Sequence, residues 1–158
     1  MIREYFLKTI LLFSFFAMSS AYYIEYILGY QPCNLCILQR IPYIGSIIII
    51  TFFFIFKRFE KLILFTILIL FFFGFIISFY HFGIENNFFQ ESFICNLTGD
   101  SKITNSSELL KSLKTGPISC KDVPFKLLGM SLASINTVLT LIICVISLRI
   151  LVNYEKNK

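Results

Sequence analysis

The sequence predicts an all-α integral membrane protein, an antiparallel four-helix transmembrane bundle with one large loop. Three observations support this fold class. Of the 158 residues, 57% are hydrophobic and only 15% are charged, and the mean hydropathy is +0.80. Four apolar runs are long enough to cross a hydrocarbon layer about 30 Å thick, and helices satisfy the backbone there. The other residues suffice only for ends and loops, so the chain 1–158 is expected to form a single membrane domain.

The four predicted spans cover approximately residues 6–27, 37–56, 62–80 and 127–148. The second and third spans are separated only by Lys57 to Lys61, which is enough for a tight turn between antiparallel neighbours. The third and fourth spans are separated by residues 81–126, which hold Gly, Ser, Asn and Pro and most of the acidic residues. This segment is the one sizeable polar loop.

The distribution of charge assigns the two sides of the membrane. Four crossings put both termini and the 57–61 turn on one side, with eight Lys and Arg residues against three Glu, whereas the other side carries six basic and six acidic residues. The positive-inside rule therefore places the termini in the cytoplasm and residues 28–36 and 81–126 outside. Tyrosines are expected to form a belt at the outer boundary. These are Tyr22, Tyr23, Tyr26, Tyr30, Tyr43 and Tyr80.

Two features also fit other classes of protein. A net charge of +5 is typical of some nucleic-acid-binding proteins, but the basic residues form no cluster larger than the one at 57–61, so no nucleic-acid partner is predicted. Arg3 and Lys8, the following apolar run and the small residues 19–21 fit a cleavable signal peptide. Because the apolar run resumes at Tyr22 and reaches full span length, a transmembrane helix is favoured.

Four of the five cysteines lie in segments predicted to be outside. Four cysteines permit three pairings. Cys33 and Cys36 form a C-x-x-C, a local redox pair, which leaves Cys95 with Cys120, and an oxidising compartment permits both disulfides. Cys144, within the fourth span, is expected to be a small apolar packing residue.

Zinc binding and passive cross-linking are the alternatives for these cysteines. Structural zinc sites use two short-spaced ligand pairs, but Cys95 and Cys120 are 25 residues apart, so no metal is predicted. A C-x-x-C closes too small a loop to constrain the unfolded chain much, whereas the same spacing at a helix start lowers a thiol pKa. A reactive pair is therefore favoured.

The position of the C-x-x-C supports reactivity. It follows Pro32 and directly precedes the second span, so unpaired backbone N–H groups and the helix dipole are expected to stabilise a thiolate. Arg40 lies four residues after Cys36, on the same face of a helix. Arg40 also fits a membrane-interface anchor. Its coincidence with the C-x-x-C favours a functional charge near the sulfur.

Three stretches of the chain match known sequence motifs. Residues 33–40, CNLCILQR, resemble the signature C-x-L-C-x-x-Q-R of the DsbB family of bacterial disulfide-bond formation proteins. Residues 80–85, YHFGIE, are similar to its Y-H-x-G-x-E, and residues 128–133, LGMSLA, with Asn136 are similar to the opening of its fourth span. Cys95 and Cys120 occupy the positions of the two loop cysteines of that family. The resemblance covers essentially the whole chain.

The resemblance implies an inner-membrane thiol:quinone oxidoreductase. Such an enzyme reoxidises a periplasmic DsbA-type oxidase of the thioredoxin fold and passes the electrons to the membrane quinone pool, either ubiquinone or menaquinone. Residues 28–36 and the loop 81–126 are then periplasmic, and the lipid bilayer surrounds the four spans.

The resemblance also implies roles for the site residues. The reduced partner is expected to attack the Cys95–Cys120 disulfide at Cys95, and the freed Cys120 exchanges with Cys33. Cys36 is then the thiolate that donates electrons to the quinone. Arg40 would stabilise negative charge on the sulfur and on the quinone oxygen.

The remaining candidates have weaker signals. His81 would donate a hydrogen bond to a quinone carbonyl or move a proton. The alternative is that it is an ordinary interfacial histidine with no functional role. Asn136 is expected to bond a neighbouring helix. Residues 93–94 would suit a hydrophobic groove on the partner, and residues 107–113 are expected to form a short amphipathic turn.

Two other functions stay open. One is a sister disulfide oxidoreductase with a different dedicated partner, either DsbI-like or similar to vitamin K epoxide reductase. In the vitamin K family the C-x-x-C comes late in the chain, whereas here it comes early. The other is a structural or transport membrane protein with passive disulfides, which would never form a mixed disulfide with a soluble partner.

Overall fold

The computed structural model describes residues 2–57, 59–90, 95, 120–121, 125–127 and 129–156. Most of these residues are helical, in α1 (Ile2–Tyr26), α2 (Asn34–Leu38), α3 (Ile41–Phe56), α4 (Glu60–Glu85) and α7 (Leu132–Lys156). Together with α2 as the start of the second span, they form four stretches long and apolar enough to cross a membrane. The predicted all-α four-helix membrane bundle is confirmed.

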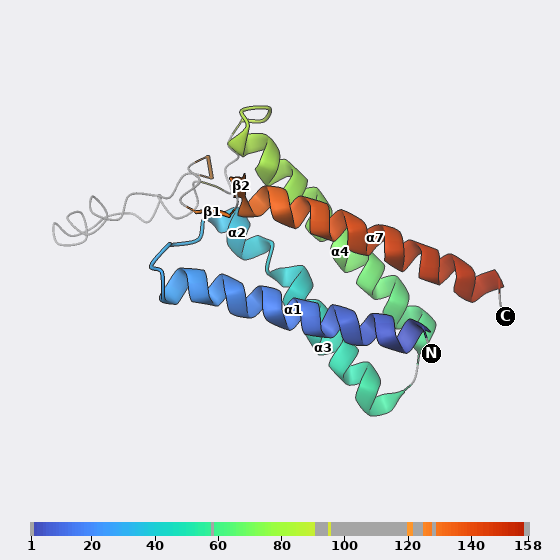
Figure 1. The fold of residues 1–158 in the computed structure, drawn as a ribbon. Helices are drawn as coiled ribbons and strands as arrows, with labels where there is room; N and C mark the ends of the chain where they lie inside the picture. Colours follow the sequence, from blue (N-terminus) through green and yellow to red (C-terminus); the bar gives the residue numbers. More distant parts are fainter. Residues whose placement is uncertain are drawn as a thin grey trace, which may run out of the picture.

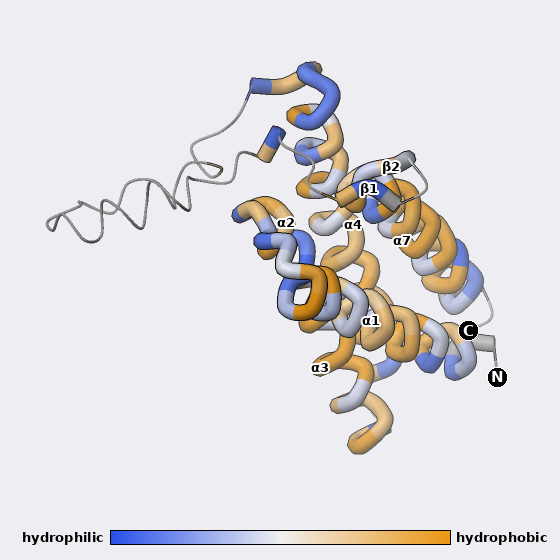
Figure 2. The backbone as a smooth tube through the Cα atoms, turned by 60° about the vertical axis from the view of Figure 1, so that its left-hand side comes forward, coloured by the Kyte–Doolittle hydropathy of each residue, from blue (hydrophilic) through white to orange (hydrophobic). Residues whose placement is uncertain are grey.

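The long helices alternate in direction. Helix α4 packs against α7, α1 against α3, and α3 against α4. Both chain ends and the α3–α4 turn lie at one end of the bundle, while α2 and a small antiparallel pair of strands, β1 (Lys126–Leu127) and β2 (Met130–Ser131), lie at the other (Figure 1). Hydrophobic residues run along the helices, and hydrophilic ones gather near their ends (Figure 2).

The half of the bundle nearer the chain ends holds an apolar core. Its most buried side chains include Leu7, Ile50, Leu64, Ile67 and Phe71, each with no exposed surface. We call this group, with the apolar residues packed on it, the terminal-side core. Many Phe and Ile side chains on the opposite helix faces are half exposed, as a lipid-facing surface requires.

Helices α3 and α4 approach closely at a glycine. A Cβ atom placed on Gly74 would lie 2.8 Å from Cγ of Pro42, which is too near for any real contact. Small residues at such crossings allow helix backbones to pack tightly in a membrane. A side chain larger than glycine at position 74 would therefore force α3 and α4 to shift.

The second span is not the single helix expected from residue 37. Helix α2 begins earlier, at Asn34, and a two-residue turn at Gln39 and Arg40 separates it from α3. Pro42 has no N–H to donate to the carbonyl four residues before it, so the helical ladder is interrupted at this point.

Three other expectations about boundaries and burial are corrected. Helix α4 continues to Glu85, so residues 81–85 form its last turn and are not part of the loop. Helix α7 begins at Leu132, because Met130 and Ser131 form strand β2, and Gly129 directly before that strand has a left-handed φ of 82°. Tyr43 is buried inside the bundle and does not belong to the interfacial belt.

The partner-docking role expected for residues 93–94 and the amphipathic turn expected for residues 107–113 both lie outside the described residues.

Candidate active site

The C-x-x-C lies at the start of α2. Cys33 is the N-cap residue, and its Sγ accepts a hydrogen bond from the backbone N–H of Cys36 at 3.3 Å. The two Sγ atoms are 3.0 Å apart and both residues are thiols, which differs from the expected second disulfide. A helix N-terminus stabilises the anionic sulfur and hence the reduced form of such a pair. The sequence predicted this helix-start environment, and the structure assigns the cap to Cys33.

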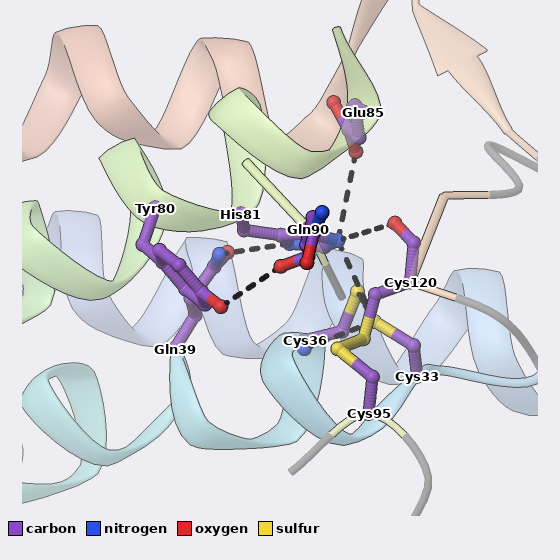
Figure 3. Close-up of a disulfide and its surroundings, with 9 residues drawn as sticks. All are labelled: Cys33, Cys36, Gln39, Tyr80, His81, Glu85, Gln90, Cys95 and Cys120. Carbon is purple, nitrogen blue, oxygen red and sulfur yellow. Dashed lines mark hydrogen bonds and ion pairs between the residues drawn. A yellow bond between two sulfur atoms is a disulfide. The ribbon is translucent and has the colours of Figure 1, made fainter. Parts of the chain in front are cut away.

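The loop cysteines form the other pair. Cys95 and Cys120 are joined by a disulfide with a Cα–Cα distance of 5.8 Å, so the predicted pairing is confirmed. Both residues are buried, and they pack with Cys33, Leu35 and apolar residues of α4. We call this group the outer cluster. All four outer sulfur atoms gather beside the end of α4 (Figure 3).

His81 connects the two cysteine pairs. It lies on the last turns of α4 and is 3% exposed. Its Nε2 is 3.6 Å from Sγ of Cys33 and 3.3 Å from the carbonyl oxygen of Cys120 (Figure 3). The carboxylate of Glu85, one turn further along α4, is 3.7 Å from the same nitrogen. The imidazole is therefore held directly beside the sulfur at the helix cap.

The other ring nitrogen of His81 joins a buried polar chain. Nδ1 is 3.0 Å from Nε2 of Gln39, and Oε1 of Gln39 accepts a hydrogen bond from Nδ2 of Asn136 at 3.1 Å. Oδ1 of Asn136 in turn accepts from the Tyr43 hydroxyl. The expectation that Asn136 bonds a neighbouring helix is confirmed. Sequence reasoning missed Gln39 and Tyr43, although a lone glutamine within an apolar run is the kind of signal that indicates a buried polar contact.

These surroundings stabilise a thiolate on Cys33. The hydrogen bond from the Cys36 thiol is the largest influence lowering the pKa of Cys33, burial opposes it, and hydrogen bonding with His81 lowers the pKa further. Together they lower the pKa of Cys33 from 9.0 to about 4. The sulfur at the helix cap is thus ionised at neutral pH and is a competent nucleophile and leaving group.

Arg40 is held by a partner that the sequence reasoning missed. Its Nη1 lies 2.6 Å from Oε2 of Glu25 on α1, and its guanidinium lies over the ring of Tyr22 at 5.1 Å. The bend at residues 39–40 replaces the continuous helix on which Arg40 would have lain one turn below Cys36. A single acidic residue inside the first apolar run was the available signal for this ion pair.

A cavity of about 330 Å³ adjoins the C-x-x-C, a volume typical of small-molecule sites. Its walls are mostly apolar and come from α1, α3 and α7, with Phe13 and Leu139 among them. A few polar groups from the site line the same cavity. They are Cys36, Gln39, Arg40, Glu25, His81 and Asn136.

Comparison with known proteins identifies the family. The sequence model of the family described as "Disulfide bond formation protein DsbB" matches residues 3–150. The chain belongs to the DsbB family. A protein of Rickettsia prowazekii (strain Madrid E) described as "Uncharacterized protein RP370" is 33% identical over 147 residues, which cover 92% of this chain and 86% of that protein.

Membership of the DsbB family gives the site its general chemistry. The protein is a disulfide oxidoreductase that acts in disulfide-bond formation, and it is a multi-pass membrane protein. The residues that resemble the family signature lie in one place, with CNLCILQR in α2 and the bend, YHFGIE at the end of α4, and Asn136 in α7. The two cysteine pairs therefore meet where three of the four spans converge.

Metal binding is the other chemistry that these side chains permit. Possible ligand atoms of Cys33, Cys36 and His81 lie within 4.8 Å of one another. A ligating histidine offers a nitrogen lone pair, and an imidazole nitrogen that carries a proton has none to offer. The position of the His81 proton therefore decides between the two chemistries.

Proposed function

We propose that this DsbB-family protein is an inner-membrane thiol:quinone oxidoreductase that reoxidises a periplasmic DsbA-type oxidase and passes the electrons to a membrane quinone. The observation that carries this proposal is the position of the reduced C-x-x-C. Cys33 is packed in the outer cluster with the Cys95–Cys120 disulfide, while Cys36 borders an apolar cavity. One pair can therefore exchange with the loop disulfide and also deliver electrons to a ligand inside the bundle.

Each turnover moves two electrons through the two cysteine pairs. A thiolate of the partner attacks Cys95, the Cys95–Cys120 bond breaks, and Cys120 leaves as a thiolate. Cys120 attacks Cys33 of the oxidised C-x-x-C, which releases Cys36 as a thiolate. The second thiol of the partner then attacks the sulfur that is bonded to Cys95, so the partner departs with its own disulfide.

The last exchange leads to the arrangement seen in the structure. The released Cys95 attacks Cys120, the Cys95–Cys120 bond re-forms, and the electron pair leaves on the sulfur of Cys33. Both electrons are then held by Cys33 and Cys36 as thiols beside the cavity, while the loop pair is a disulfide. Burial of Cys95 and Cys120 supports assignment of this geometry to internal exchange, since attack by a partner requires an accessible sulfur.

The cavity residues fit a quinone. When bound, the quinone supplies an acceptor of two electrons and two protons that returns Cys33 and Cys36 to the disulfide. The mostly apolar walls suit a flat ring, and Cys36 is one of the polar residues that line the cavity. Arg40 lines the same cavity, where its guanidinium would stabilise negative charge, with Glu25 holding it in position.

The proposed orientation places the end of the bundle with α2 and the strands in the periplasm. The excess of Lys and Arg at the chain ends and the 57–61 turn supports a cytoplasmic position for the opposite end. Both chain ends and that turn do lie together in the bundle (Figure 1). A cysteine-free variant with single cysteines at either end, tested with a membrane-impermeant maleimide, checks this orientation.

The deciding experiment follows quinone reduction by the purified protein. A reduced thioredoxin-fold oxidase is mixed with the protein and a short-chain ubiquinone or menaquinone analogue, and loss of quinone absorbance is compared with loss of partner thiols. We expect one quinone consumed per dithiol, no reduction with Cys36→Ser, and full activity with the matched control Cys144→Ser. Undiminished turnover in Cys36→Ser would remove the assignment. Quinone reduction with dithiothreitol but not with the DsbA-type partner would favour a DsbI-like or vitamin K epoxide reductase-like enzyme.

A further inference from the structure

The groups around Nε2 of His81 indicate that this nitrogen carries a proton. A backbone carbonyl is only an acceptor, and the carbonyl oxygen of Cys120 lies 3.3 Å from Nε2. The carboxylate of Glu85 at 3.7 Å and the sulfur of Cys33 at 3.6 Å are acceptors as well when ionised. A bare Nε2 would direct its lone pair at these electron-rich atoms. The surroundings therefore favour Nε2–H.

The polar chain on the other side of the ring leads independently to the same result. The Tyr43 hydroxyl donates to Oδ1 of Asn136, so this amide presents its N–H₂ group to Oε1 of Gln39. Gln39 has then used its oxygen and presents its own N–H₂ group to Nδ1 of His81, 3.0 Å away. Nδ1 accepts this hydrogen bond only if it carries no proton. The chain from α3 through α7 thus leaves Nε2 as the protonated nitrogen.

We propose that Gln39 is a positioning residue that holds His81 as the neutral tautomer, with Nδ1 bare and the Nε2 proton directed at the sulfur of Cys33. The proposal rests on the proposed function, because the step it serves is exchange between the C-x-x-C and the loop cysteines. Asn136 and Tyr43 act one and two hydrogen bonds further away, by fixing which way the Gln39 amide faces.

The donor acts when Cys33 is released from Cys120. In that step the Cys95–Cys120 bond forms, the Cys33–Cys120 bond breaks, and the electron pair leaves on Cys33. A hydrogen bond from Nε2 stabilises the leaving thiolate and so speeds its departure. Because a neutral imidazole keeps its proton, the sulfur is stabilised as a thiolate without being protonated. The proton on Nε2 also means that this nitrogen has no lone pair for a metal ion.

Other ionisable groups also face this sulfur. Sγ of Cys36 in α2 lies 3.0 Å from Sγ of Cys33 and donates to it when Cys33 is a thiolate. Glu85 of α4 lies beside His81, and its carboxylate accepts from the Ser131 hydroxyl of β2. The charge of Lys126 in β1 acts on Glu85. None of these contacts involves Gln39, so a change at Gln39 tests the histidine tautomer separately from the local charge.

The tautomer can be read directly, because His81 is the one histidine of the sequence. Protein labelled with ¹⁵N-histidine and purified without a histidine tag gives one pair of ring nitrogen signals. At neutral pH we expect a protonated Nε2 and a bare Nδ1. In Gln39→Glu the carboxylate can only accept, so Nδ1 becomes protonated. The control Gln90→Leu changes an exposed glutamine and leaves both signals unchanged.

A second readout follows the reactivity of Cys33. In the reduced protein, mass spectrometry measures alkylation of Cys33 by iodoacetamide against pH. Gln39→Leu frees His81 to rotate or change tautomer, and we expect the midpoint of the profile to rise by about one pH unit and internal exchange to slow about tenfold. Asn136→Asp, a nearly isosteric change, leaves Gln39 without its donor and moves the same signals in the same direction.

The outcomes separate this proposal from the proposed function. A bare Nε2 in the unmodified protein, or two protonated ring nitrogens at neutral pH, overturns the tautomer assignment. An unchanged alkylation profile in both Gln39→Leu and Asn136→Asp overturns the positioning role. If Gln39→Leu does not fold, Gln39→Glu and Asn136→Asp decide by the nitrogen signals alone. Absence of quinone reduction with the expected nitrogen signals contradicts the proposed function and leaves the tautomer assignment standing.

Discussion

The two ends of the bundle are held together by different interactions. The terminal-side core consists of apolar side chains such as Leu64, Ile67 and Phe71, which contact one another without direction. At the other end, the cysteines of the outer cluster lie beside His81, and the polar contacts there each need a donor and an acceptor. Lipid is as apolar as the core, so the core is stabilised by close packing more than by water exclusion. The outer end has a fixed arrangement because its polar groups are linked by directional contacts between donors and acceptors.

Polar contacts also occur deeper in the bundle, but as isolated pairs. The hydroxyls of Ser14 and Ser46 are 2.9 Å apart between α1 and α3, and those of Ser78 and Thr140 are 3.4 Å apart between α4 and α7. Losing one such pair affects only two helices. In the outer cluster the bonds are linked, so a change at one residue alters the direction of the next. The comparison indicates that the outer end is sensitive to substitution because its hydrogen bonds are linked to one another, and not only because its residues are polar.

The largest difference between the two ends is expected for His81→Phe. This change removes the donor to the Cys33 thiolate, and hydrogen bonds to charged groups contribute about 1.5–3 kcal/mol. The pKa of Cys33 then rises from about 4 by one to two pH units, and exchange slows about 10- to 100-fold. The pH profile of Cys33 alkylation measures the shift. The core variant Phe71→Leu should lower the free energy of unfolding but leave that profile in place, and a similar shift in both variants would contradict the comparison.

The next largest effect is on packing between the two ends. Gly74→Ala forces a methyl group against Pro42, and overpacking costs about 1–3 kcal/mol in the free energy of unfolding. Gly45→Ala is the matched control, because its Cβ would meet only the movable end of Leu70, at 3.2 Å. Unfolding by sodium dodecyl sulfate in mixed micelles measures both. Equal losses would show that the Pro42 contact is not the tighter one.

Two substitutions of Cys36 separate its hydrogen bond from its redox role. The hydroxyl of Cys36→Ser can still donate to the Cys33 thiolate, whereas Cys36→Ala removes the group that lies 3.0 Å from that sulfur. Because a lowered pKa reflects a stabilised thiolate, the alanine variant should raise the alkylation midpoint of Cys33 by about one pH unit more than the serine variant. Between pH 6 and about 8 the reduced unmodified protein should react at a nearly constant rate and lose reactivity only as the pH falls toward about 4. Coincident profiles for the two variants would assign the low pKa to another cause.

The smallest effects are expected at isolated serines inside the bundle, and they differ in sign. Ser14→Ala breaks the bond to Ser46 and should cost about 0.6 kcal/mol, the average for such bonds in a membrane. The hydroxyl of Ser147 is buried and has no hydrogen-bond partner within the described part of the chain, so Ser147→Ala should raise the free energy of unfolding by up to about 1 kcal/mol. The same micelle unfolding experiment compares them. Destabilisation by Ser147→Ala would indicate a partner for that hydroxyl.

Local spacing predicted much of the site. The C-x-x-C next to an apolar span indicated a sulfur at a helix start, and the structure has Cys33 at the N-cap of α2. Elimination among the outer cysteines gave the Cys95–Cys120 disulfide. His81 was expected at the outer end of its helix, but its contacts with Cys33 and Gln39 were not. A spacing along one helix identifies neighbours one turn apart and carries no information about which residue of another helix they face.

The sequence by itself therefore determined the four apolar helices, the cysteine pairs and the resemblance to a family, since each depends on composition or on short spacings. Only the tertiary structure decided the partners of Gln39, Arg40 and Tyr43, which lie on other helices. Those partners depend on how each helix is rotated and on the bend before Pro42. Rotation and bend are set by close packing between helices far apart in the chain, and a pattern read along one segment does not contain that geometry.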